Sequence, residues 1–399
     1  MAPIRTIPSI RLPDSKIPAH VRPPIGYNHK RVVDGIQFGA RFKANFKHDK
    51  RPRKRVNGLR PEDPRGPPPK LSDLELVKML GKGGNGQVIL VRTKASTVFA
   101  LKSVRKKQLR TFDMDPNPSE RDNERSILVH MEWNPFVTGV LQAFHDDRNV
   151  YMMLEYSPCG SLDEFIGRPF ATAHALFYFA NIVCGLEFLE KLDIIHRDLK
   201  PGNILVGPDG YLQLCDFGTA EFTPAPGDGT TAEDWINQGT APYQSPECFG
   251  LKRQPSNMRL GAAIDWWAAG VTLFEMLTGK LPFPLPAGHV SGAAMDSEGC
   301  TMIWEQIMAG PPRWPARVSP PRNLGSLLMG LLTIDANERL GAGGAIEVRR
   351  HPWLAAVDWN KMWRKRYIPP RFVTPKQPDF LPARGVEPKH FLGLRVATR

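Results

Sequence analysis

Two short runs of the sequence contain the side chains whose chemistry is most recognisable. The run HRDLKPGN at residues 196–203 combines a carboxylate (Asp198), a cation (Lys200) and an amide (Asn203), and the run DFG that follows adds a second carboxylate, Asp216. A carboxylate that accepts a hydroxyl proton, a lysine that faces phosphate and two oxygen ligands for magnesium are what phosphoryl transfer requires. We therefore expect Asp198 to be a catalytic base, Lys200 to neutralise phosphate charge, and Asn203 and Asp216 to hold the metal.

A glycine-rich run precedes these motifs. Residues 81–88 read GKGGNGQV, with Gly81, Gly83 and Gly86 at the spacing G-x-G-x-x-G. Glycines let backbone amides approach phosphate groups because no Cβ atom stands in the way. The run lies between two predicted strands and not between a strand and a helix, which favours a phosphate-covering loop over a dinucleotide-binding fold.

Lys102 ends an apolar, β-branched strand predicted at residues 98–102. A buried lysine without a partner costs several kcal/mol, so Lys102 needs anionic groups nearby. Nucleotide phosphates and a helix glutamate would supply them. Glu124 is the candidate glutamate, and Glu120, one turn away, is the alternative.

The order of the predicted elements indicates the fold class. Strands are expected at residues 74–80, 88–91, 98–102 and 150–156, and helices at 118–130, 173–191 and 262–278. Residues 282–300 are rich in Gly, Pro and Ala and are predicted to form a loop. Strands first and helices afterwards predict an α+β protein with a sheet lobe and a helical lobe.

Over residues 74–354 these motifs together resemble the eukaryotic protein kinases, and within them the AGC group of Ser/Thr kinases. Three further features carry the resemblance: Asp265 in the run DWWAAG, Glu247 after Ser245-Pro246, and Arg339 in DANERL. In that group the aspartate braces the catalytic loop from a buried helix, and the glutamate pairs with the arginine. The resemblance implies a bilobal kinase fold, with a small β-rich N-lobe containing one main helix and a larger, mostly helical C-lobe. It also implies boundaries at 71–157, 158–354 and 355–399, the last being a C-terminal tail.

The resemblance implies an ATP- and Mg²⁺-dependent transfer of phosphate to Ser and Thr hydroxyls of protein substrates, by a monomeric catalytic unit. A pseudokinase scaffold that binds nucleotide without efficient transfer is the alternative. The adenine would lie against the apolar residues Leu80, Val88, Ala100 and Leu205. The hinge would offer backbone groups from Glu155 and Ser157, and the paired Lys102 and Glu124 would position the phosphates.

Two departures from the group concern Arg197, which precedes the catalytic aspartate, and the residues that read the substrate. In switched kinases a phosphorylated residue pairs with this arginine, but Ile236 stands at the expected position. We hypothesise either a permanent carboxylate or another phosphorylated threonine, the candidates being Glu233 and Asp234, or Thr230 and Thr231.

Substrate recognition is the other departure. Ser161 and Gly202 stand where the group often has acidic residues that read basic substrates, while Glu275 is retained. Asp163 and Glu164 are candidates to compensate. The end of the chain, residues 388–394, lacks an aromatic docking motif, so the tail is expected to bind the small lobe differently or hardly at all.

Composition adds limits on location and partners. Residues 1–70 contain 12 Pro, and 17 Lys and Arg against 5 Asp and Glu, which leaves 36 basic and 35 acidic residues for the rest. We expect this arm to be largely disordered. Its basic run, from Lys50 to Arg55, is a candidate nuclear-import signal or polyanion-binding patch, with a solvated charge run as the alternative. The 5 unpatterned Cys and the absence of a long apolar run or a signal-like start lead us to expect a cytoplasmic or nuclear protein without a membrane span.

Overall fold

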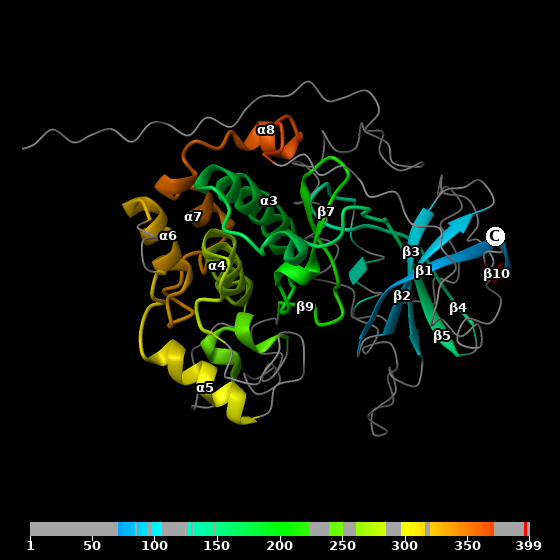
Figure 1. The fold of residues 1–399 in the computed structure, drawn as a ribbon, viewed down its shortest axis with the longest axis horizontal. Helices are drawn as coiled ribbons and strands as arrows, with labels where there is room; N and C mark the ends of the chain where they lie inside the picture. Colours follow the sequence, from blue (N-terminus) through cyan, green and yellow to red (C-terminus); the bar gives the residue numbers. More distant parts are fainter. Residues whose placement is uncertain are drawn as a thin grey trace, which may run out of the picture. The chain divides into compact units, whose positions relative to one another are not determined.

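The computed structural model describes residues 71–83, 86–93, 98–105, 124, 127–128, 131, 133–146, 148–223, 239–249, 261–284, 297–315, 320–370 and 395–396. The basic arm, residues 1–70, and Glu120 lie outside the described residues. The chain divides into two compact units between Pro158 and Cys159. The described residues before that point, together with 395–396, form a sheet unit, and residues from Cys159 onward form a helical unit. The α+β class is confirmed (Figure 1).

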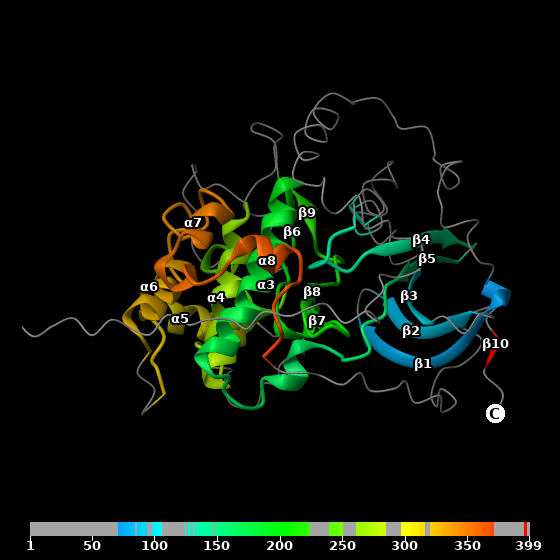
Figure 2. The same cartoon turned by 90° about the horizontal axis from the view of Figure 1, so that it is seen from above.

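The sheet unit is built on one twisted sheet with the strand order β10-β1-β2-β3-β5-β4 (Figure 2). Its neighbouring strands are antiparallel except for the pair of β1 with β10. The strands are β1 (Leu74–Gly83), β2 (Gly86–Thr93), β3 (Val98–Arg105), β4 (Val140–His145), β5 (Asn149–Leu154) and β10 (Arg395–Val396). Glu124, Ile127 and Leu128 are helical, within the predicted helix 118–130, most of which lies outside the described residues.

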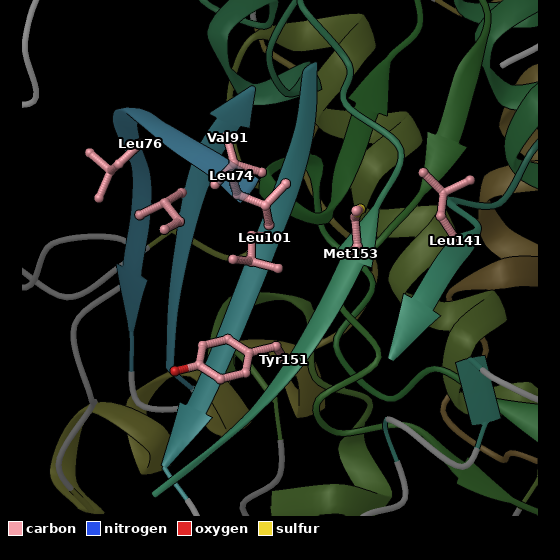
Figure 3. Close-up of a cluster of buried hydrophobic side chains, with 8 residues drawn as sticks. Leu74, Leu76, Val91, Leu101, Leu141, Tyr151 and Met153 are labelled. Carbon is pink, nitrogen blue, oxygen red and sulfur yellow. The ribbon is translucent and has the colours of Figure 1, made fainter. Parts of the chain in front are cut away.

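One face of this sheet carries a hydrophobic cluster (Figure 3). Its members alternate along their strands, because successive side chains of a strand point to opposite faces. Leu74 and Leu76 come from β1, and Tyr151 and Met153 from β5. Burial raises the pKa of the Tyr151 hydroxyl, which donates to Asp146 Oδ2 at 2.8 Å. The other members are Ile89, Val91, Leu101 and Leu141.

The C-terminal strand β10 adds to the edge of the sheet. Arg395 pairs with Glu75 and Val396 with Leu76, in parallel. A free sheet edge exposes unpaired N–H and C=O groups, and an added strand satisfies them. The end of the chain therefore returns to the sheet unit through backbone pairing.

The helical unit is built around α3 (Thr172–Lys191) and α4 (Ala263–Thr278), which pack against each other (Figure 1). Nearly all of α4 is buried, including Trp266 and Trp267. Around them lie α5 (Ser297–Met308), α6 (Arg322–Leu331), α7 (Ala345–Arg349) and α8 (Trp359–Trp363). The prediction of a loop at residues 282–300 is wrong for its last residues, because a helix begins at Ser297.

The helix α3 has the length and composition of a membrane span. Among the described residues, it is the one helix of sufficient length and hydropathy, with a mean hydropathy of 1.3. However, 72% of that window is buried inside the unit. Core helices of folded domains have the same composition, so this feature is weak evidence for a membrane span.

Two small β-ladders and several short 3₁₀ segments complete the helical unit. β6 (Ile194–Ile195) pairs with β9 (Glu221–Phe222), and β7 (Ile204–Val206) pairs with β8 (Leu212–Leu214). The 3₁₀ segments here are η3 (Leu162–Phe165), η4 (Pro201–Asn203), η6 (Ala241–Tyr243), η7 (Pro246–Phe249) and η8 (Pro352–Leu354), while η1 (Leu71–Asp73) opens the sheet unit.

The segment that follows the last helices of the helical unit packs back onto the β7–β8 hairpin. The Tyr211 hydroxyl donates to the carbonyl of Tyr367 and accepts from its N–H, both at 2.8 Å. Lys365 Nζ lies 2.9 Å from Asp209 Oδ2. The first part of the predicted tail is thus fixed to the helical unit.

A buried ion pair connects η7 with the segment after α6. Arg339 Nη1 and Nη2 donate to the two carboxylate oxygens of Glu247 at 2.7 and 2.8 Å, and both side chains are almost fully buried. Arg339 also donates to the carbonyls of Thr333 and Ile334 and stacks over Trp267, with 5.1 Å between guanidinium and ring centroid. The pair expected from the resemblance is therefore present.

We expect Arg339→Ala to lower the free energy of unfolding by about 3–5 kcal/mol, because it leaves the Glu247 carboxylate buried without its partner. Urea unfolding of the full chain measures this. Arg322→Ala, at an exposed position of α6, is the matched control and should change the value by less than about 0.5 kcal/mol. The double variant Arg339→Met with Glu247→Gln should recover part of the loss. An Arg339→Ala protein as stable as the control would contradict this interpretation.

Candidate functional site

The loop between β6 and β7 contains the HRDLKPGN run, and a buried carboxylate on α4 holds its backbone. Asp265 Oδ2 accepts the N–H of His196 at 2.7 Å, and its Oδ1 accepts the N–H of Arg197 at 2.9 Å. Arg197 has φ +64°, a left-handed conformation that costs a non-glycine residue about 1–2 kcal/mol. Burial raises the pKa of Asp265, while its hydrogen bonds and the neighbouring cationic groups lower it. Asp265 therefore stabilises a strained turn directly before Asp198.

The Asp198 carboxylate is held through both of its oxygens. Thr240 Oγ1 donates to Oδ1 at 2.7 Å, while Lys200 Nζ and Asn203 Nδ2 donate to Oδ2, each at 2.8 Å. Lys200 Nζ also lies 2.5 Å from Thr240 Oγ1. Three donors to its two oxygens hold the carboxylate in one orientation.

Gly239 lets the segment carrying Thr240 approach this loop. Its φ is +92°, and a Cβ built on it would lie 2.4 Å from the Arg197 carbonyl oxygen. No L-residue with a side chain fits that distance without moving the backbone. The glycine therefore brings the Thr240 hydroxyl within reach of Asp198.

Asn203 and Asp216 come from the two segments that flank the β7–β8 hairpin. The backbone N–H of Cys215 donates to the carbonyl of Asn203 at 2.9 Å, which places Asp216 one residue beyond that contact. Because Asn203 Nδ2 is used by Asp198, the amide presents its Oδ1 oxygen. An amide oxygen and the exposed Asp216 carboxylate are oxygen ligands that suit magnesium, which takes few protein ligands and several waters or phosphate oxygens. No group of three or more His, Cys, Asp and Glu arranged for a metal occurs in the described part of the chain.

His196 connects the loop with the DFG run. Its Nε2 lies 2.9 Å from the Cys215 carbonyl, and its ring centroid lies 5.1 Å from that of Phe217. The ring is fully buried. This contact fixes Asp216 relative to the loop that carries Asp198.

In the sheet unit, Lys102 and Glu124 form a nearly dry ion pair. Nζ lies 2.5 Å from Oε1, and the side chains are 6% and 10% exposed. Lys102 is on β3, and its neighbours in the sheet are Val88 on β2 and Met152 on β5. The pair satisfies the buried lysine as its burial requires. The structure thus brings together Lys102 and the first of its two candidate partners.

The residues predicted to contact adenine in this unit lie on three adjacent strands. Leu80 is exposed on β1, Val88 lies opposite Gly81, and Ala100 pairs with Leu90 and Leu154. Leu205 belongs to the helical unit, where it lies on β7.

The glycine-rich run forms the end of β1 and the start of β2, with Gly83 opposite Gly86. Gly86 has φ +125°, and a Cβ there would lie 2.4 Å from the carbonyl oxygen of Ser103. This glycine is therefore required for packing on β3, a reason that the phosphate-loop prediction did not include. Gly84 and Asn85 lie outside the described residues.

The two predicted hinge residues, Glu155 and Ser157, are both buried. The Glu155 carboxylate accepts from Trp133 Nε1 at 3.0 Å and from the N–H of Gly139 at 3.3 Å. Its own N–H donates to the Gly139 carbonyl at 3.2 Å. That backbone donor is already used within the sheet unit. The backbone group that Glu155 can offer a nucleotide is therefore its carbonyl oxygen.

The sequence missed one residue that the structure brings to the loop. Glu221 Oε2 on β9 lies 2.7 Å from Arg197 Nη1. The four partners hypothesised for Arg197 from the sequence all lie outside the described residues. The feature that could have identified Glu221 is a carboxylate five residues after Asp216, on a strand that pairs beside the loop.

An acidic group, the Asp163 carboxylate, lies beside Gly202. A Cβ on Gly202 would lie 3.9 Å from Asp163 Oδ2, and Ser161 Oγ donates to Asp163 Oδ1 at 2.5 Å. Glu275 Oε2 accepts from the Tyr243 hydroxyl at 2.7 Å. Burial raises the pKa of Glu275, the Tyr243 hydrogen bond lowers it, and the charge of Asp163 raises it further. The charge of Asp163 therefore acts on the Glu275 carboxylate.

Comparisons with known proteins agree with this geometry. The protein kinase domain family matches residues 74–354. The human cAMP-dependent protein kinase catalytic subunit PRKX is 33% identical over 325 residues, which are 78% of this chain and 80% of that protein. The serine/threonine-protein kinase YPK1 of Saccharomyces cerevisiae is 33% identical, and ribosomal protein S6 kinase 2 beta of Xenopus laevis 34%. The matched regions are 77% of this chain in both cases, but only 41% and 46% of those longer proteins.

The matched region includes both the Lys102–Glu124 pair and the loop around Asp198. The resemblance stated from the motifs is confirmed. The chain belongs to the protein kinase family and, within it, to the AGC group of serine/threonine kinases, which are phosphotransferases.

Proposed function

We propose that this protein transfers the γ-phosphate of ATP to serine and threonine hydroxyls of protein substrates, with Asp198 as the catalytic base. The observation that carries the proposal is the Asp198 carboxylate, which is held by Thr240, Lys200 and Asn203. A base that is held in one orientation can accept the proton of an attacking hydroxyl without reorganising.

The other residues of the helical unit support this chemistry. Lys200 lies close enough to the Asp198 carboxylate to neutralise charge on the transferred phosphate beside it. The oxygens of Asn203 and Asp216 would hold magnesium. When bound, magnesium would neutralise charge on the phosphate oxygens.

In the sheet unit, Lys102 would contact the α- and β-phosphates while Glu124 holds its ammonium group in place. Backbone amides of the run that contains Gly81, Gly83 and Gly86 would cover the phosphates. The adenine would contact apolar residues, with backbone groups of the hinge next to it. These are Leu80, Val88, Ala100 and Leu205, with Glu155 and Ser157 in the hinge.

Peptide specificity is the second part of the proposal. Asp163 and Glu275 would attract basic residues of the substrate, although Gly202 and Ser161 lack the acidic groups common in the AGC group. Support comes from the position of Asp163 beside Gly202 and its influence on Glu275. We propose a moderate preference for arginine near the phosphorylated residue.

Asp198→Asn should lower kcat by at least about 100-fold, because an amide cannot accept the hydroxyl proton. Lys102→Met should also abolish most transfer, because it removes the phosphate contact and leaves Glu124 buried without its partner. Incorporation of radiolabelled phosphate into mixed basic and acidic proteins measures both effects. Glu305→Gln, an exposed carboxylate-to-amide change on α5, is the control and should match wild type.

Equal incorporation by wild type and by both variants would rule out the enzymatic assignment. Wild type that binds a fluorescent ATP analogue but transfers nothing would instead support the pseudokinase alternative.

Asp163→Asn and Glu275→Gln should each reduce kcat/KM for arginine-containing peptides by about 2- to 5-fold, the effect of one partly exposed ion pair. A peptide-library profile of each variant provides the measurement. Glu305→Gln, an exposed carboxylate-to-amide change on α5, is the control. Tyr243→Phe tests whether loss of the hydrogen bond to Glu275 alone has an effect. An unchanged arginine preference in both acidic variants would contradict the proposed specificity.

A further inference from the structure

The ion pair between Arg197 and Glu221 connects the loop of Asp198 with the strand that follows Asp216. Arg197 Nη1 lies 2.7 Å from Glu221 Oε2, and the side chains are 12% and 37% exposed. Arg197 Nε donates to the Thr219 carbonyl at 2.6 Å. The guanidinium therefore contacts both a carboxylate and a backbone acceptor of the same segment.

The position of Arg197 makes a counter-charge necessary. Burial lowers the pKa of its guanidinium, and Glu221 is the strongest of the acidic neighbours that oppose this shift. A buried cation without an anionic partner costs several kcal/mol. The backbone of Arg197 is held by Asp265, and its side chain is held by Glu221 and the Thr219 carbonyl.

The same region contains further contacts between the two segments. Ile195 pairs with Glu221 in the β6–β9 ladder, and Thr219 Oγ1 donates to the His196 carbonyl at 3.1 Å. These contacts join the residues just before Asp198 to the residues just after Asp216. A change in the position of β9 would therefore move one of the two carboxylates relative to the other.

In kinases that are switched by phosphorylation, a phosphate on the activation segment pairs with the arginine before the catalytic aspartate. Here Ile236 has no hydroxyl at the expected position. A carboxylate that already pairs with the arginine would repel an incoming phosphate.

We propose that Glu221 is a permanent counter-charge for Arg197 and a positioning residue for the Asp198 loop, which makes catalysis independent of activation-segment phosphorylation. Glu221 contacts no reacting atom in this proposal. It acts by holding Arg197, and through Arg197 the loop that carries Asp198. The inference rests on the proposed kinase function and concerns how the same site is controlled.

The test begins with full-length protein treated with phosphatase and shown by intact mass to carry no phosphate. We expect this wild type to be active. Glu221→Gln, which removes the charge at nearly constant shape, should lower kcat by about tenfold with little change in the KM for ATP, as expected when an interaction that orients the catalytic groups is lost. Glu221→Asp should retain more activity than Glu221→Gln, because it retains the charge. Glu305→Gln is the matched control.

Two further measurements separate positioning from folding. Amide hydrogen exchange of residues 216–222 should become faster in Glu221→Gln, while that of α3 and α4 stays unchanged. In a double-mutant cycle, Arg197→Ala with Glu221→Ala should lose no more activity than Arg197→Ala alone, because the carboxylate acts only through the arginine.

Wild type that is inactive without phosphate and becomes active once phosphorylated would overturn the inference and leave the kinase function intact. Wild type that is inactive in both forms would overturn both. Glu221→Gln with wild-type kcat, or additive losses in the double-mutant cycle, would also overturn the role of Glu221.

Discussion

The conformation of the loop before Asp198 depends on one buried carboxylate, Asp265. It lies in the first turn of α4, where nearly every other side chain is apolar, and its two oxygens accept the N–H groups of His196 and Arg197. These hydrogen bonds satisfy two backbone N–H groups that are not paired in a β-ladder. They also offset the energetic cost of the left-handed conformation of Arg197. Without them, the loop before Asp198 has no reason to adopt this conformation. The core helix thus defines the backbone on which the candidate base sits.

Besides Asp265, buried ion pairs in the described part of the chain join segments that are distant in the sequence. Lys102 and Glu124 connect β3 with a helical turn, and Arg339 and Glu247 connect the segment after α6 with η7. Ion pairs of this kind contribute little net stability compared with apolar packing, but breaking one leaves a costly unpaired charge. Their main effect is to specify which segments must lie together. This is the property that a site built from several segments requires.

Much of the fold and the site could be predicted from the sequence, because the relevant signals are local. Strand alternation, the long apolar helices and the two motifs identify the α+β class and most candidate residues. The rest depends on tertiary contacts that no local pattern encodes. Glu221 was missed because an acidic residue on a two-residue strand is ordinary until β9 is known to pair with β6. The helix that begins at Ser297 was missed because Gly and Pro upstream obscured its start, and the return of β10 to β1 joins positions more than 300 residues apart.

The central claim is that Asp265 maintains the geometry of the Asp198 loop, and Asp265→Asn tests it most directly. An asparagine keeps one acceptor oxygen but places an NH₂ group opposite a backbone N–H, so one of the two hydrogen bonds becomes a repulsive contact. Steady-state kinetics should show a kcat at least about tenfold lower, with the Kd of a fluorescent ATP analogue within about threefold of wild type. An Asp265→Asn protein that is folded and has wild-type kcat would contradict the account.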